Sequence, residues 1–263
     1  MEQKLNKKDV QNNLDLLDKI SRSKEIHSVE SQHSGVIRVL QLDSVRYLVF
    51  GPGGRTTIQG GINLLSPRDV VLPYYELCAD TIGDISSSGS ALCIGLGAGY
   101  LPKEVKIRTG CEVEVVEVDK EVEKVAYEFF DFPKNIQVHI CDGFNFVMSS
   151  TKKYDFINVD TYRGNQIPFQ MVTSEFFDKC KSLLTEDGVF SINLCSNHVF
   201  YECHLNTLMS VFENDLYMNQ RLYNSVVYNV RKHKVSESSN FSVHKIKKTE
   251  KIEKSKIFSM GSV

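Results

Sequence analysis

The sequence predicts an α/β fold in which a parallel β-sheet is covered by helices on both faces. From residue 91 onwards, short apolar runs such as residues 91–97 and 154–160 alternate with segments of helical character such as residues 173–188. A run of serine and glycine at residues 86–90 marks the place where this alternation starts. Strands that alternate with helices are typical of parallel sheets buried on both faces.

The chain before residue 86 follows a different pattern. Polar residues with apolar ones at near-helical spacing come first, and glycine is frequent further on. We expect an amphipathic helix within residues 1–28, two short strands at 35–43 and 45–51, a glycine-rich loop at 51–61 and a helix at 66–85. Ser66 is the expected cap of that last helix.

The remaining elements alternate as a parallel sheet requires. We expect strands at residues 91–97, 112–119, 136–143, 154–160 and 189–195, and helices at 101–110, 120–132, 173–188 and 200–216. The helix at 173–188 begins with Thr173 or Ser174 as its cap. Residues 222–232 are interpreted as one or two final strands.

The bulk composition excludes several classes of protein. The chain has 263 residues, of which 41% are hydrophobic and 24% charged, and this is ordinary for a globular protein with a sizeable core. A formal net charge of −2 gives no reason to expect nucleic acid or a membrane surface as partner. No apolar run approaches a membrane span, and the first 20 residues lack the apolar core of a secretory signal. A cytoplasmic location is therefore expected.

The cysteine pattern agrees with a reducing compartment. The seven cysteines are scattered, mostly in apolar stretches, and no CxxC pair occurs, which predicts buried, reduced thiols. One group could be drawn as a metal site, namely Cys195, His198, Cys203 and His204. Its spacing fits no common zinc pattern, so we expect no metal.

A glycine-rich turn follows the strand at residues 91–97. Gly95, Gly97 and Gly99 alternate with other residues and lead into the next helix. Glycine permits the positive φ angles of such a turn and lets a ligand approach backbone N–H groups. The helix N-terminus behind the turn favours negative ligand charge. The pattern predicts a nucleotide-binding turn.

Two acidic strand ends strengthen this interpretation. Glu117 ends the next strand, where a carboxylate can accept hydrogen bonds from both ribose hydroxyls. Asp142 and Gly143 follow the third strand, and the carboxylate there can accept a hydrogen bond from an adenine amino group.

Two nucleotide classes compete for this turn. An NAD site prefers GxGxxG, whose third glycine would stand at the position of Tyr100. The GxGxG pattern with two acidic strand ends better suits adenosine carried on sulfur, as in S-adenosylmethionine. A third interpretation is that the glycines merely turn the chain and that Glu117 is a solvated strand end.

In these motifs the sequence resembles the spermidine synthase family. The similarity runs from about residue 44 to residue 194 and is carried by motifs such as "CIGLGAGYLPKEV", "VEVVEVDKEVEKVAYEFF", "VHICDGFNFV" and "YDFINVDTY". The resemblance implies a Rossmann-like class I S-adenosylmethionine-dependent transferase fold with a seven-stranded sheet and a small N-terminal β domain. It also implies a donor pocket at the carboxyl ends of the strands, and a homodimer.

The resemblance gives site residues their expected roles. Gln59 reaches the donor from the N-terminal segment, while Tyr74 and Tyr75 line the pocket, with Tyr74 near the chemistry and Tyr75 on the substrate. Glu117 holds the ribose and Asp142 the adenine, with Gly95, Gly97, Gly99 and Gly143 supplying the close backbone. Asp160 faces the reacting centre and is the leading candidate for the catalytic base.

The sequence departs from the family at two positions. Family members usually read GGGDG in the loop, where the aspartate pairs with the ammonium of decarboxylated S-adenosylmethionine, but Ala98 stands there in this chain. They also read DxxD after the fourth strand, and here Arg163 replaces the second acid. Arg163 would disfavour a polycationic polyamine and favour an acceptor that carries a carboxylate.

These departures favour methyl transfer, or another alkyl transfer, from S-adenosylmethionine to a small acceptor. The alternative is aminopropyl transfer from decarboxylated S-adenosylmethionine in polyamine synthesis, as in a spermidine synthase. A second alternative is a catalytically inactive nucleoside-binding or dimer-forming protein. The expected organisation is residues 1–85 as N-terminal helix and small β domain with a pocket-lining helix, 86–235 as donor-binding domain, and 236–263 as a Lys-rich, mobile tail.

Overall fold

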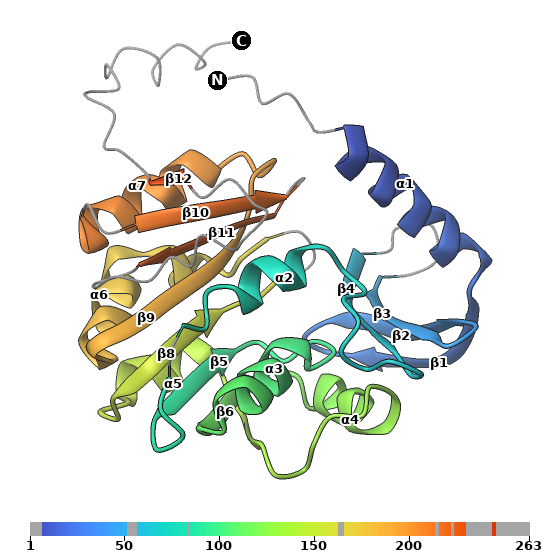
Figure 1. Ribbon diagram of the computed structural model, residues 1–263, viewed down its shortest axis with the longest axis horizontal. Helices are drawn as coiled ribbons and strands as arrows, with labels where there is room; N and C mark the ends of the chain where they lie inside the picture. Colours follow the sequence, from blue (N-terminus) through green and yellow to red (C-terminus); the bar gives the residue numbers. More distant parts are fainter. Residues whose placement is uncertain are drawn as a thin grey trace.

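Two β-sheets form the framework of the protein (Figure 1). The computed structural model describes residues 7–51, 57–83, 85–162, 166–213, 216–221, 224–229 and 244–245. The expected tail at 236–263 lies outside the described residues, except for two that form a short strand. Arg163 also lies outside them.

The first sheet is antiparallel, with the strand order β1-β2-β3-β4. Its elements are α1 (Lys7–Arg22), β1 (Lys24–Ser31), β2 (Gly35–Leu42), β3 (Val45–Phe50) and β4 (Thr57–Asn63). The predicted amphipathic helix is present as α1, whose Leu16 and Ile20 pack against the buried Leu40, Tyr47 and Val49 of the sheet. Apolar burial of this kind holds a helix that its own sequence would leave marginal.

The second sheet is mixed and has the order β12-β10-β11-β9-β8-β5-β6-β7. Its parallel strands are β5 (Ser90–Ile94), β6 (Glu112–Glu117), β7 (Gln137–Ile140), β8 (Tyr154–Val159) and β9 (Leu184–Cys195). Its antiparallel strands are β10 (Leu216–Arg221), β11 (Asn224–Asn229) and the two-residue β12 (His244–Lys245). The predicted α/β fold is confirmed, with β12 as a short addition at the edge of the seven expected strands.

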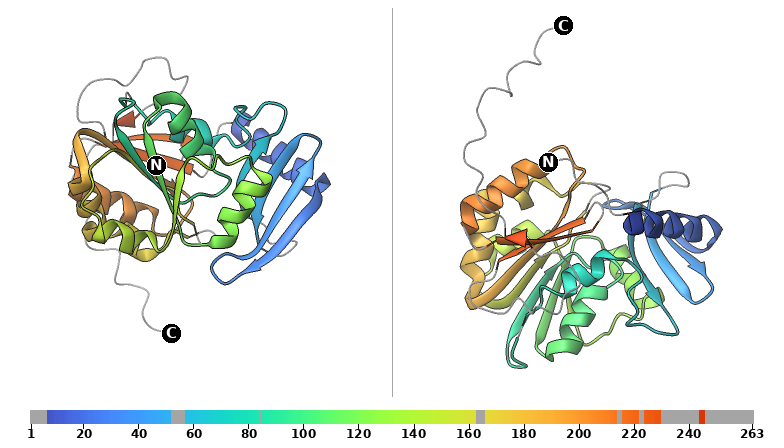
Figure 2. Two further views of the ribbon diagram at one scale, coloured as in Figure 1. Left: turned by 90° about the horizontal axis from the view of Figure 1, so that it is seen from below. Right: turned by 45° about the horizontal axis from the view of Figure 1, so that its top comes forward.

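Helices cover both faces of the second sheet (Figures 1 and 2). They are α2 (Tyr74–Ala79), α3 (Tyr100–Thr109), α4 (Lys120–Phe129), α5 (Gly143–Ser149), the 3-10 helix η1 (Phe169–Val172), α6 (Ser174–Leu183) and α7 (Tyr201–Phe212). Val105 of α3 and Val125 of α4 join one buried cluster with Val115 of β6. Phe177 of α6 joins another with Ile157 of β8. The two clusters are the two sides of a doubly covered sheet.

The predicted loop at residues 51–61 is wrong in its second half, where β4 begins at Thr57. Gly60 and Gly61 in β4 serve close packing instead of a turn. A Cβ added to Gly60 would lie 2.5 Å from the Cβ of Ala98, and one added to Gly61 would lie 2.8 Å from Cγ1 of Val71. Only glycine lets this strand approach the second sheet so closely.

The predicted helix at residues 66–85 is wrong at both ends, because α2 begins only at Tyr74 and already ends at Ala79. Ser66 does not cap a helix; its Oγ donates to Oδ1 of Asp69 at 2.7 Å within a turn. Pro73 disfavours the helical conformation in the residue before it, so the helix starts after this proline. The short helix α5 and strand β1 were not predicted at all.

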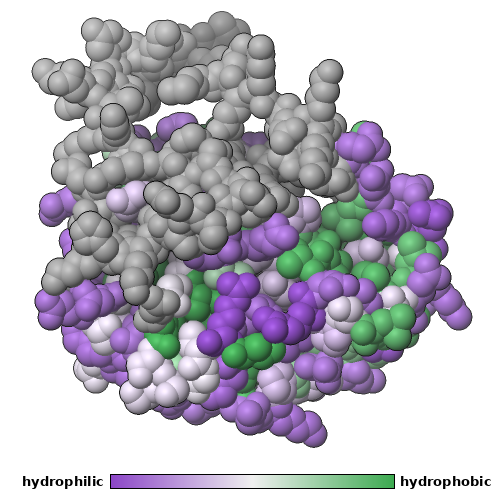
Figure 3. Space-filling model, viewed as in Figure 1, coloured by the Kyte–Doolittle hydropathy of each residue, from purple (hydrophilic) through white to green (hydrophobic). Residues whose placement is uncertain are grey.

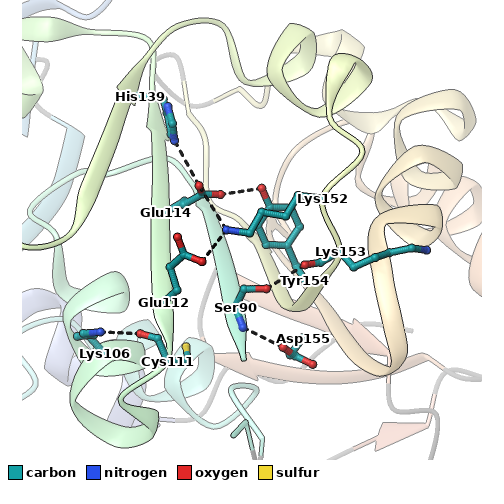
Figure 4. A network of polar contacts seen from close by, with 10 residues as sticks. All are labelled: Ser90, Lys106, Cys111, Glu112, Glu114, His139, Lys152, Lys153, Tyr154 and Asp155. Carbon is teal, nitrogen blue, oxygen red and sulfur yellow. Dashed lines mark hydrogen bonds and ion pairs between the residues drawn. The ribbon is translucent and has the colours of Figure 1, made fainter. Parts of the chain in front are cut away.

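Ion pairs hold the amino edge of the parallel strands (Figure 4). Nζ of Lys152 lies 2.7 Å from Oε2 of Glu112 and 3.5 Å from Oε1 of Glu114. The hydroxyl of Tyr154 donates to Oε2 of Glu114 at 2.8 Å, and the backbone N–H of Ser90 donates to Asp155 at 2.9 Å. These contacts join the starts of β5, β6 and β8 and leave the opposite edge free for a ligand.

Among the coloured residues of the face in Figure 3, hydrophilic ones are the more frequent, with hydrophobic patches between them. Within the described ranges, no helix combines the length and apolar character needed to cross a bilayer.

Candidate functional site

A cavity of about 720 Å³ lies at the carboxyl edge of the parallel strands. The strand order β9-β8-β5-β6-β7 arranges the residues at the strand ends along its length. They are, in that order, Asn193, Asp160, Gly95, Glu117 and Asp142. Because neighbouring strands are about 4.8 Å apart, Glu117 and Asp160 are separated by roughly 10 Å along this edge. The residues at these five strand ends therefore lie along one elongated cavity.

The glycine turn between β5 and α3 has positive φ angles at Gly95, Gly97 and Gly99. Gly95, with φ of 100°, lies against the end of β8, where a Cβ would overlap the carbonyl oxygen of Asp160. Gly99, with φ of 77°, is the N-cap of α3, and a Cβ there would overlap the ring of Phe132. Gly95 and Gly97 line the cavity, whereas Gly99 turns the chain into the helix.

One end of the cavity carries two carboxylates. Glu117 accepts hydrogen bonds from the backbone N–H of Leu96 at 3.0 Å and of Asp119 at 2.9 Å. Burial raises the pKa of Glu117, and these hydrogen bonds oppose the rise. Asp142 caps α5 through Oδ1, which accepts from the N–H of Asn145 at 2.9 Å. Each carboxylate is thus held by the backbone while lining the cavity.

The β1–β2 turn also reaches this end, and no pattern in the sequence predicts this. His33 and Ser34 line the cavity near Glu117. The Oγ of Ser31 donates to Oδ2 of Asp119, which in turn caps α4 by accepting from the N–H of Glu121. This bond ties the first sheet to the second beside the cavity.

The middle of the cavity contains Asp160. Burial raises the pKa of Asp160 to about 6, while a hydrogen bond from Asn193 lowers it. That bond runs from Nδ2 of Asn193 to Oδ1 of Asp160 at 3.0 Å. A carboxylate with this pKa is ionised at neutral pH and is still basic enough to accept a proton.

Three tyrosines surround Asp160. The hydroxyl of Tyr75 accepts from the N–H of Gly61 at 3.1 Å, and its ring stacks on Tyr100 with centroids 4.2 Å apart. Burial and the charge of Asp160 raise the pKa of Tyr74, and burial raises that of Tyr162, so these rings stay neutral. Gln59, Tyr74 and Tyr75 all line the cavity.

Replacing Asn193 by alanine should raise the pKa of Asp160. The variant loses the N–H donor that stabilises the carboxylate, and a bond to a charged group of about 1.5 kcal/mol corresponds to about one pKa unit. The measurement is a carbon-detected NMR titration of the Asp160 carboxyl. Asn158→Ser is the control, because Asn158 also lines the cavity but donates to Ser191. An unchanged pKa in Asn193→Ala would contradict the role of this bond.

No group of three or more His, Cys, Asp or Glu side chains that could hold a metal ion occurs in the part of the chain that the structure describes.

Comparison with known families decides the family of the chain. The model of the spermine/spermidine synthase domain matches residues 81–241, which is more than half of the chain. The chain belongs to the spermine/spermidine synthase family. The predicted resemblance is confirmed.

Relatives in this family differ in the group that they transfer. A probable polyamine aminopropyl transferase of Bifidobacterium longum is 32% identical over 168 residues, covering 60% of this chain and 37% of that protein. An N-terminal histidine N-methyltransferase of Emericella nidulans is 35% identical over 133 residues, covering 48% of this chain and 24% of that protein. The chain spans well under two thirds of both relatives. Further bacterial relatives are named polyamine aminopropyltransferase.

A solved structure shares the fold. The crystal structure of a probable spermidine synthase from Corynebacterium glutamicum superimposes with a TM-score of 0.70 and 21% identity, covering 81% of this chain and 83% of that one. The two proteins therefore share the same overall fold.

Proposed function

We propose that the protein is a transferase that binds an S-adenosyl sulfonium donor and moves a methyl or other alkyl group from S-adenosylmethionine to a small acceptor. The observation that carries the choice of donor is the neutral Ala98 in the glycine turn. Among the described residues that line the cavity, only Glu117, Asp142 and Asp160 are acidic. Family membership and the adenosyl ligand named for one spermidine synthase structure support the donor class.

The surroundings of Ala98 suit intact S-adenosylmethionine. Its side chain is buried, with 3% exposure, and faces Gly60 of β4. The adjacent N-terminus of α3 has no side-chain cap, so its N–H groups favour a carboxylate. A decarboxylated donor would instead place an ammonium group here, and this group would have no acidic side chain at position 98 to pair with.

The reaction is an in-line displacement. The nucleophile's lone pair forms a bond to the transferred carbon, the carbon–sulfur bond breaks, and its electron pair returns to sulfur, which becomes a neutral thioether. The acceptor's proton passes to Asp160, whose pKa of about 6 leaves it ionised at neutral pH. Tyr74 and Tyr75 would position the reacting groups.

Aminopropyl transfer from decarboxylated S-adenosylmethionine is the second candidate. It is favoured by the relatives named as aminopropyltransferases. It requires an acid to replace the one missing at Ala98 and another to replace the one missing at Arg163. An inactive nucleoside-binding or dimer-forming protein is the third candidate. Among the described residues that line the cavity, Asp160 is the only carboxylate near its middle, so few groups there can accept a proton.

Calorimetric titration with both donors tests this choice. We expect S-adenosylmethionine to bind at least as tightly as its decarboxylated form, because Ala98 cannot pair with an ammonium group. In Ala98→Asp the preference should shift toward the decarboxylated donor by about tenfold, a factor that corresponds to about 1.4 kcal/mol. Ala98→Asn is the matched control, because it adds the same bulk without charge.

Three results would overturn the proposal in different ways. A large preference of the wild-type protein for the decarboxylated donor would favour aminopropyl transfer. Failure of both donors to bind would favour the inactive interpretation. Equal donor preferences in the Asp and Asn variants would show that position 98 does not sense the end of the donor.

Sedimentation of the same samples tests the expected homodimer. The cytoplasmic location and the three-part domain division remain part of the proposal.

A further inference from the structure

The acceptor end of the cavity lies beyond β9. Glu117 and Asp142 occupy the ends of β6 and β7, on one side of the glycine turn, and Asp160 lies on the other side. Once the donor's nucleoside lies against the two carboxylates, the space left for an acceptor is the part next to β8 and β9. The segment between β9 and α7 lines that part with His198 and Phe200, and the first turn of α7 adds His204.

Three rings form a continuous surface at this end. The rings of His198 and His204 are stacked, with centroids 5.8 Å apart and planes 17° apart. The ring of Phe200 lies 5.7 Å from that of His198 with a tilt of 55°. Phe200 is 56% exposed, and both histidines are half-buried. An exposed aromatic ring beside two half-buried imidazoles has a free face available to a ligand.

A hydrogen bond determines the neutral tautomer of one histidine. The backbone N–H of Phe200 donates to Nδ1 of His198 at 3.3 Å, so in the neutral ring the proton is on Nε2. Burial and the neighbouring His198 lower the pKa of His204, which keeps that ring neutral at pH 7. No lysine or arginine is among the described residues that line the cavity, and Asp160 is the acid nearest to this end.

We propose that this three-ring surface recognises an acceptor with a planar, uncharged ring and a single amino group, which points toward Asp160. This inference rests on the proposed function, since it assigns the acceptor class for the same site. One carboxylate can accept one cationic or nucleophilic nitrogen, whereas a diamine needs a second anion for its far end. A flat ring gains dispersion and stacking against the three rings.

Calorimetry with two amines tests the acceptor class. The protein is first titrated with S-adenosylhomocysteine, the product of methyl transfer, and then with 2-phenylethylamine or 1,4-diaminobutane. We expect 2-phenylethylamine to bind at least tenfold more tightly than the diamine. Tighter binding of the diamine, or no binding of either amine, would overturn the inference. Both amines are also titrated into the unliganded protein, so a failure of S-adenosylhomocysteine to bind would contradict the proposed function alone.

Variants locate the binding surface. Phe200→Ala should lower the affinity for 2-phenylethylamine by about fivefold to tenfold, as expected for lost ring contacts. The double variant His198→Ala, His204→Ala should lower it by about the same factor. Their affinity for S-adenosylhomocysteine should not change, because the donor end is several strands away. Val199→Ala is the matched control, since Val199 is 83% exposed and adjacent to Phe200. Equal affinities in all variants would place the amine elsewhere and overturn the inference.

Discussion

Replacing Asp160 by asparagine should abolish transfer while making the protein more stable at pH 8. The carboxylate of Asp160 is the only acidic side chain near the middle of the cavity among the residues described, so its loss removes the proton acceptor. General-base catalysis typically contributes about a hundredfold to ten-thousandfold to a rate. The rate of the wild-type protein should fall as the pH drops through about 6, because protonation of Asp160 removes the base.

The stability effect has the opposite sign. The pKa of Asp160 is about 6 in the folded protein, against 3.8 for an exposed aspartate. Folding therefore favours the protonated form, so the contribution of Asp160 to the free energy of unfolding is most favourable below about pH 4 and falls as the pH rises through 6. Over this range the loss is at most about 3 kcal/mol, and Asp160→Asn removes it.

Urea unfolding of both proteins at pH 4 and pH 8 measures this difference. Asparagine keeps an oxygen that accepts the hydrogen bond from Asn193, so the variant should retain the local geometry. The two proteins should have similar free energies of unfolding at pH 4 and differ most at pH 8. A variant that is less stable at pH 8 would mean that the charge of Asp160 is well solvated in the fold. Full activity in the variant would exclude Asp160 as the base.

The sequence was sufficient for the order of the parallel strands and insufficient for the N-terminal part. It also placed the start of β9, at Leu184, inside the helix predicted at 173–188. Alternating apolar runs and caps are local signals, and the predicted cap at Thr173 is present, with its Oγ1 accepting from the N–H of Phe176. The strand β4 was missed because Gly60 and Gly61 look like turn residues. They are needed for contacts with Ala98, 38 residues after Gly60, and with Val71 in the loop after β4, and a pattern within one strand does not predict such contacts.

The site was predictable to the extent that it lies on strand ends. Glu117, Asp142 and Asp160 each directly follow or end an apolar run, and parallel strands bring such positions to one edge. His33 and Ser34 come from a different sheet, and only the packing of the two sheets brings them to the cavity. Asn193 belongs to a strand whose role in the site depends on its neighbour β8. Sequence patterns within one segment carry no information on such pairings.

Replacing Glu117 by alanine should weaken binding of S-adenosylhomocysteine by about a hundredfold. A carboxylate that accepts from two ribose hydroxyls makes two charge-assisted hydrogen bonds, and their loss is worth about 3 kcal/mol. The side chain also holds the glycine turn through the N–H of Leu96, so alanine removes a positioning contact as well. Glu117→Gln keeps the shape of the side chain and one acceptor oxygen, so its affinity for S-adenosylhomocysteine should fall by only roughly tenfold. Calorimetric titration measures both.

Two comparisons separate ribose recognition from a general loss of structure. Glu112→Ala is the matched control, because Glu112 starts the strand that Glu117 ends, and its side chain is 59% exposed in an ion pair with Lys152. It should bind S-adenosylhomocysteine like the wild-type protein. A 2′-deoxyribose analogue of the ligand should bind more weakly than its parent to the wild-type protein, and this difference should shrink in Glu117→Gln. If the deoxy analogue binds the wild-type protein as tightly as its parent, the 2′-hydroxyl is not a partner of this carboxylate. Glu117 would then act only by fixing the turn between β5 and α3 through Leu96 and Asp119.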